Sequence, residues 1–141
     1  MPYIQNRLVH DADSHLMEMS DCLNPYFEKS LLGRFLEHPN LGVRVGNRLA
    51  VEEAQKRQED EAFRAAAGEN IMLRKNYDAQ GAFLRGDRSA AVDHIGVASQ
   101  LVFTTFCLGN FGFDQSAYAD LCYGAATAHN RMMTDFCSVD K

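Results

Sequence analysis

The sequence predicts an α/β fold built around two parallel strands, and two observations support this. Residues 8–15 begin with apolar side chains and end in acidic residues and a histidine, as a short strand does where it enters a loop. Residues 97–106 are β-branched and aromatic with almost no charge, which is typical of a buried parallel strand. A short helical pattern directly precedes the second stretch, so the order strand, helix, strand indicates a βαβ unit.

The first predicted strand carries the candidate site. Side chains alternate between the two faces of a strand, so Asp11, Asp13 and His15 are expected to point the same way. Carboxylate oxygen and imidazole nitrogen at such short spacing suit a divalent metal. The alternative is an ordinary polar strand end with a surface histidine, and the spacing alone leaves both interpretations open.

A long excursion, about residues 19–86, follows the first strand. Within it, residues 41–51 alternate in hydrophobicity around Gly46-Asn47, which predicts a β-hairpin. Residues 52–67 are rich in helix-forming residues and predict a helix that ends near Gly68. Its acidic side chains are more typical of a solvated helical face than of a metal or partner site.

The second half of the chain contains a predicted helix, strand, loop and helix. The helix covers residues 88–95, with Asp87 as its N-cap and Gly96 at its end. In the loop after the second strand, three aromatic residues either line a substrate pocket or cover the core: Phe106, Phe111 and Phe113.

The last predicted helix begins near Asp114 or Ser116 and runs through residue 137. Its apolar side chains recur at spacings of three and four, which indicates one continuous stripe. His129 lies on this stripe and is expected to be a core or interface histidine rather than a metal ligand.

Composition excludes several classes of protein. A net charge of -5 without a basic stripe argues against nucleic-acid binding. The 141 residues contain no apolar run that could span a membrane and no signal-peptide pattern. The four cysteines are widely spaced and contain no Cys-x-x-Cys pair, which favours free thiols in a cytoplasmic protein.

The segment Asp11-Ala12-Asp13-Ser14-His15-Leu16-Met17-Glu18 resembles the opening motif of the amidohydrolase-related metal-dependent hydrolases, in the branch of the aminocarboxymuconate-semialdehyde decarboxylases. The resemblance implies that Asp13 and His15 bind a divalent metal, Zn or Mn. It also implies hydrolysis or decarboxylation of a small carboxylic acid. It gives no ligand role to Glu18.

The resemblance further implies a partial (β/α)8 barrel: the first two βα units, with a helix and hairpin insertion after the first strand. A complete barrel needs about 250 residues, so this segment of 1–141 is expected to be the N-terminal part of such an enzyme and inactive alone. We expect it to form a homo-oligomer or to associate with a completing chain.

A different interpretation treats the chain as a non-catalytic, helix-rich α/β module that self-associates or binds a protein partner. Its basis is the apolar stripe of the last helix, which would be exposed if nothing covered it.

Overall fold

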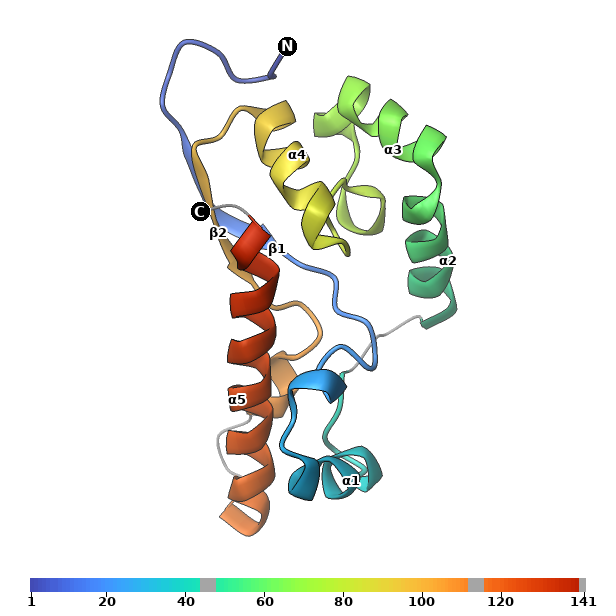
Figure 1. Ribbon diagram of the computed structural model, residues 1–141, viewed down its shortest axis with the longest axis vertical. Coiled ribbons are helices and arrows are strands. Elements are labelled where there is room, and N and C mark those ends of the chain that lie inside the picture. Colours follow the sequence, from blue (N-terminus) through green and yellow to red (C-terminus); the bar gives the residue numbers. More distant parts are fainter. Residues whose placement is uncertain (44–47, 112–115, 140–141) are drawn as a thin grey trace.

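A computed structural model describes residues 1–43, 48–111 and 116–139 (Figure 1). The fold is α/β and mostly helical, with one small parallel sheet of two strands. The elements in chain order are β1 (His10–His15), α1 (Lys29–Glu37), α2 (Arg48–Glu59), α3 (Glu61–Ala67), α4 (Arg85–Ile95), β2 (Ser99–Phe103) and α5 (Ala119–Phe136). The predicted fold class and the parallel βαβ order are therefore confirmed, whereas the barrel itself stays a prediction.

The two strands pair in parallel, but β1 contains a bulge. Asp11 lies opposite Gln100 and Ser14 lies opposite Val102, so three steps along β1 match two steps along β2. A bulge of this kind shifts the alternation of side chains by one residue. The prediction that Asp11, Asp13 and His15 simply alternate onto one face is therefore wrong, because it assumed a regular strand.

Helix α4 precedes β2 in the connection between the two strands, and it ends at Gly96 as predicted. Gly96 ends the helix with φ of 85°, and its N–H donates to the carbonyl of Val92 at 2.8 Å. A Cβ atom at this glycine would lie 2.4 Å from the carbonyl oxygen of Ile4, so the N-terminal segment leaves no space for a side chain. The predicted cap is wrong, however: α4 begins at Arg85, and Asp87 lies within its first turn.

The predicted hairpin is wrong where the structure describes it. Residues 48–51 belong to α2, and the expected turn at Gly46-Asn47 lies outside the described residues. On a helix, residues three or four positions apart share one side: Val51 and Ala54 are three residues apart and both fully buried. Glu52 reinforces the helix by accepting a hydrogen bond from Arg48 Nε, one turn earlier, at 2.6 Å.

The predicted helix over residues 52–67 is two helices, because Asp60 starts a new one. Its carboxylate accepts hydrogen bonds from the backbone N–H groups of Ala62 and Phe63, at 2.8 and 3.2 Å. These bonds satisfy two of the four free N–H groups at the start of α3.

Helix α5 supplies most of the core from the C-terminal half of the chain. Its stripe is buried against residues of the segment after β1 and of α1; the buried α5 residues are Leu121, Gly124, Ala125, Ala128, Met132 and Phe136. Figure 1 shows α5 running beside the sheet and past α1. The expectation that this stripe is exposed is therefore wrong, since α1 and its preceding turn cover it. The expected capping is not seen either: Tyr118 precedes the helix without a side-chain cap, and Asp114 lies outside the described residues.

Strand β2 is less buried than its apolar sequence predicts. Leu101 and Phe103 are 57% and 42% exposed, while Gln100 and Val102 are half-buried. Among the described residues, the face of β2 that carries Leu101 and Phe103 is therefore the more exposed one. None of the helices in residues 1–43, 48–111 and 116–139 has the length and apolar character needed to cross a membrane.

Candidate metal site at the end of strand β1

Asp13 and His15 lie next to each other at the C-terminal end of β1. His15 Nε2 is 3.4 Å from Asp13 Oδ1, and the side chains are 44% and 87% exposed, respectively. Asp11 lines the same cavity but is bound to β2 instead: its Oδ2 accepts a hydrogen bond from Gln100 Nε2 at 3.0 Å. Of the three candidate ligands on β1, the structure therefore places Asp13 and His15 in direct contact with each other.

The ring of His15 is held by the segment that follows β2. Its Nδ1 lies 3.1 Å from the carbonyl oxygen of Thr104 and 3.3 Å from Thr105 Oγ1. A carbonyl can only accept, so Nδ1 carries the proton and Nε2 keeps its lone pair in the neutral ring. Histidines that bind metals commonly donate their second ring N–H to a carbonyl in this way.

A cavity of about 410 Å³, here named the β1 cavity, opens beside this pair. It lies between the end of β1, the side of α4 that carries Arg88, Ala91 and Ile95, and the segment of residues 71–82. Its charged and amide-bearing lining residues are Asp11, Asp13, His15, Arg74, Lys75, Asn76, Gln80, Arg88 and Gln100. Both signs of charge are thus available around a small polar ligand.

Arg88 of α4 holds the end of β1 in place. Its guanidinium donates to Ser14 Oγ at 3.0 Å and to the carbonyl oxygen of His15 at 2.7 Å. Burial lowers the pKa of Arg88 from its ordinary value, because a charged guanidinium loses hydration there. An arginine remains charged even so, and its hydrogen bonds to β1 offset part of the lost hydration.

Glu18 is the residue whose role the sequence did not reveal. It is 1% exposed, and its carboxylate accepts hydrogen bonds from Thr104 Oγ1, from the N–H of Thr105 at 3.2 and 3.0 Å, and from the N–H of Phe106 at 2.8 Å. Glu18 therefore fixes the backbone just after β2, the same segment that holds His15. A buried acid near the carboxyl end of a strand was the available signal, but its partners lie 86 to 88 residues away.

The two aromatic candidates for substrate binding that the structure describes, Phe106 and Phe111, make contacts away from the β1 cavity. Phe106 stacks with Tyr77 at a centroid distance of 6.4 Å, and the rings of Phe111 and His129 make a T-shaped contact at a centroid distance of 5.1 Å. Neither lines the β1 cavity, and Phe113 lies outside the described residues. Phe111 packs against the core cluster, which agrees with the core-covering alternative.

His129 is half-buried on α5, as expected for a core histidine. Its Nε2 has no hydrogen-bond partner among the described residues. Burial lowers the pKa of His129, and the negative charge of Glu18 opposes that shift.

The donor set at β1 suits a divalent metal as part of a coordination shell. Two ligands of one tetrahedral zinc, with bonds of about 2.0–2.2 Å, lie about 3.4 Å apart. Asp13 Oδ1 and His15 Nε2 have that separation. Within the described ranges, no third His, Cys, Asp or Glu joins them into a group able to hold a metal.

No family model, curated protein or solved structure matches this chain. The resemblance to the amidohydrolase-related enzymes therefore stays a prediction from the sequence, and its most specific part is Asp13 and His15 at the end of β1.

Proposed function

We propose that Asp13 and His15 are two ligands of a divalent-metal site, in an amidohydrolase-related enzyme that acts on small carboxylic acids. The single observation that carries this proposal is the 3.4 Å approach of His15 Nε2 and Asp13 Oδ1. In the neutral ring both atoms are acceptors, so a cation between them relieves their repulsion. A metal ion or a proton on the histidine can supply that cation.

The surroundings favour the metal over an ordinary ion pair. The Thr104 carbonyl directs the lone pair of His15 toward Asp13, as the outer partners of metal-binding histidines do. Arg88 fixes the backbone of His15 through its carbonyl, and Glu18 fixes the segment that holds the ring. The two ligands thus belong to backbone that buried groups keep in position.

When bound, a divalent metal supplies a Lewis acid that polarises a carbonyl or carboxylate oxygen. The residues of the β1 cavity supply the binding of an acid: Arg74 and Lys75 carry positive charge beside the pair. Asp13 and His15 would hold the metal, while further ligands would come from the substrate, solvent or a second polypeptide, since catalytic zinc normally has three protein ligands. The substrate class follows from the resemblance and from these two cations.

The proposal is tested by calorimetric titration of the purified chain with Zn²⁺ alone, and separately with Mn²⁺. We expect one metal per chain, and a loss of affinity of about tenfold or more in Asp13→Asn and in His15→Ala. His10→Ala is the matched control, because His10 is an exposed histidine on the same strand whose Nδ1 contacts Ser99 Oγ at 2.8 Å.

Equal affinity in wild type and in both site variants would reject Asp13 and His15 as ligands. Equal losses in His10→Ala would show that the titration measures scattered surface histidines. If the metal-loaded chain also turns over a small unsaturated or aromatic carboxylic acid, His15→Ala should abolish turnover while its circular-dichroism spectrum stays unchanged.

A second candidate function, self-association or partner binding, is favoured by the exposed apolar side chains of β2. Leu101 and Phe103 are large apolar side chains with 57% and 42% exposure on a strand of only five residues. Native mass spectrometry tests it: a defined assembly that Leu101→Lys disrupts would support this function, and a monomer would count against it.

A further inference from the structure

Two thiols from distant parts of the sequence meet in the core. Cys22 Sγ and Cys107 Sγ are 4.0 Å apart, although the residues are 85 positions apart in the chain. Cys22 lies in the turn after β1, and Cys107 lies just beyond β2. The pair therefore lies where the segment after β1 contacts the segment after β2.

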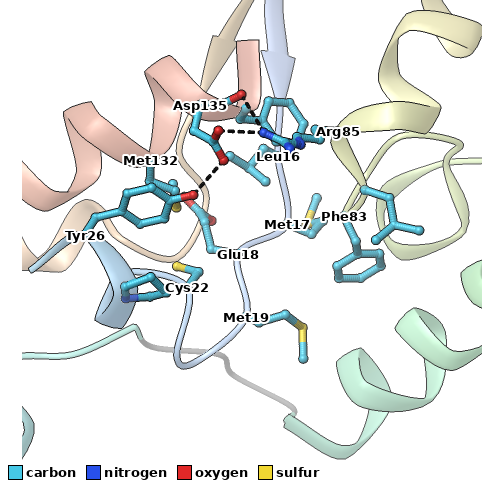
Figure 2. A pocket seen from close by; sticks show the side chains of 13 residues that line it. Leu16, Met17, Glu18, Met19, Cys22, Tyr26, Phe83, Arg85, Met132 and Asp135 are labelled. Carbon is cyan, nitrogen blue, oxygen red and sulfur yellow. Dashed lines mark hydrogen bonds and ion pairs between the residues drawn. The ribbon is translucent and has the colours of Figure 1, made fainter. Parts of the chain in front are cut away.

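The two thiols differ in their access to solvent. Cys107 is fully buried, and its pKa is raised by its contact with Cys22 and by burial. Cys22 is half-buried and lines a second cavity of about 330 Å³, together with Glu18, Tyr26 and Met132 (Figure 2). Cys22 lines this cavity and Cys107 does not, so a small solute in the cavity meets Cys22 first.

We propose that Cys22 and Cys107 are a redox-active pair that forms a reversible disulfide with low-molecular-weight disulfides as the oxidant. The Cys22 thiolate attacks one sulfur of the oxidant, whose S–S bond breaks and releases one thiol, leaving a mixed disulfide on Cys22. The Cys107 sulfur then attacks Cys22 Sγ while its proton passes to the departing thiolate, which leaves as the second thiol. Two protein thiols are oxidised, one small disulfide is reduced to two thiols, and the two protons pass to the leaving groups.

The movement that the bridge requires is small. A disulfide bond is about 2.05 Å long, so the sulfur atoms must approach by about 2 Å. Cys22 lies in a turn rather than within a helix or strand, and can supply that movement without breaking a regular element. Because the bridge closes a long loop, it should raise the urea midpoint of the oxidised chain.

The experiment uses the full chain, incubated under native conditions with oxidised glutathione, then acid-quenched, alkylated and digested for mass spectrometry. We expect a peptide pair linked through Cys22 and Cys107, and the loss of two of the four alkylatable thiols. The double variant Cys122→Ser/Cys137→Ser is the control and should form the same bridge. In Cys107→Ala, Cys22 should retain one glutathione, because no second thiol releases it.

The same oxidation of the chain unfolded in urea shows how much of each disulfide forms without the fold. There the shorter loop between Cys122 and Cys137 should close more readily than the long loop between Cys22 and Cys107. A native bridge through Cys122 or Cys137, or no bridge while Cys22 carries glutathione, would overturn the proposal. So would equal yields of the Cys22–Cys107 bridge in native and unfolded chain. The alkylation map of the wild type decides the matter even if Cys107→Ala fails to fold.

Discussion

Two acidic residues from one short stretch, Asp13 and Glu18, end in opposite surroundings. The Asp13 carboxylate is 87% exposed and faces His15, which is itself an acceptor when neutral. The Glu18 residue is 1% exposed and accepts hydrogen bonds from Thr104, Thr105 and Phe106. A carboxylate whose lone pairs are satisfied by the protein has a structural role, whereas one left open beside a histidine can bind a ligand.

The exposed pair of Asp13 and His15 depends on the buried Glu18. Glu18 fixes the N–H groups of Thr105 and Phe106, and the carbonyl of Thr104 in the same segment fixes His15. The buried acid therefore orders the support of the exposed site. Four predictions test this division between a structural and a ligand-binding acid, from the largest effect to the smallest.

The largest effect is expected for Glu18→Gln. The amide has one acceptor oxygen where the carboxylate has two, so it cannot accept all the hydrogen bonds that Thr104 Oγ1 and the N–H groups of Thr105 and Phe106 donate to Glu18. We expect the free energy of unfolding to fall by about 2–4 kcal/mol, measured by urea denaturation. Asp13→Asn is the matched control. A loss of similar size in that variant would show that the two acids do not differ in their contribution to stability.

A smaller loss is expected for Arg88→Met, which keeps the length of the side chain but removes its hydrogen bonds to Ser14 and His15. The free energy of unfolding should fall by about 1–3 kcal/mol. The same measurement on Arg7→Met, at an exposed position, should change by less than about 0.5 kcal/mol. Equal effects would mean that the bonds to β1 contribute nothing to stability.

The third prediction concerns pH. The pKa of His129 is lowered in the folded chain by burial, so the unfolded chain takes up a proton first as the pH falls through about 6.5. Protonation of the unfolded chain lowers the free energy of unfolding on acidification, whereas above that range both states are neutral at this residue. Urea denaturation between about pH 8 and pH 5.5 should show a shallower dependence in His129→Gln. An unchanged dependence would contradict it.

The smallest effect on stability is expected at the candidate site itself. In the absence of metal, His15→Ala should change the free energy of unfolding by less than about 0.5 kcal/mol, because the side chain is exposed and its hydrogen bonds are replaced by water. Thermal unfolding with and without Zn²⁺ sharpens the test: the metal should raise the midpoint of wild type and not of His15→Ala. A large loss without metal would assign a structural role to His15.

Local patterns predicted much of the secondary structure. Gly96 is suited to the left-handed conformation that ends α4, and the spacing of apolar residues predicted α5. The hairpin prediction failed at residues 48–51 because Leu49 and Val51 fit the alternation of a strand, whereas in α2 they point to different sides: Leu49 is exposed and Val51 is fully buried. Burial of Val51 against the rest of the chain selected the helix.

For the candidate site, the sequence by itself determined which chemistry is available: Asp13 and His15 place a carboxylate and an imidazole two residues apart on a strand, a spacing that fits a metal site as well as an ordinary polar strand end. Tertiary structure alone decided which acids are open. Asp11 is bound to Gln100 of β2, and donors from the segment after β2 occupy Glu18. Those partners lie nearly ninety residues away, and no local pattern encodes a hydrogen bond whose two groups meet only when distant strands pair.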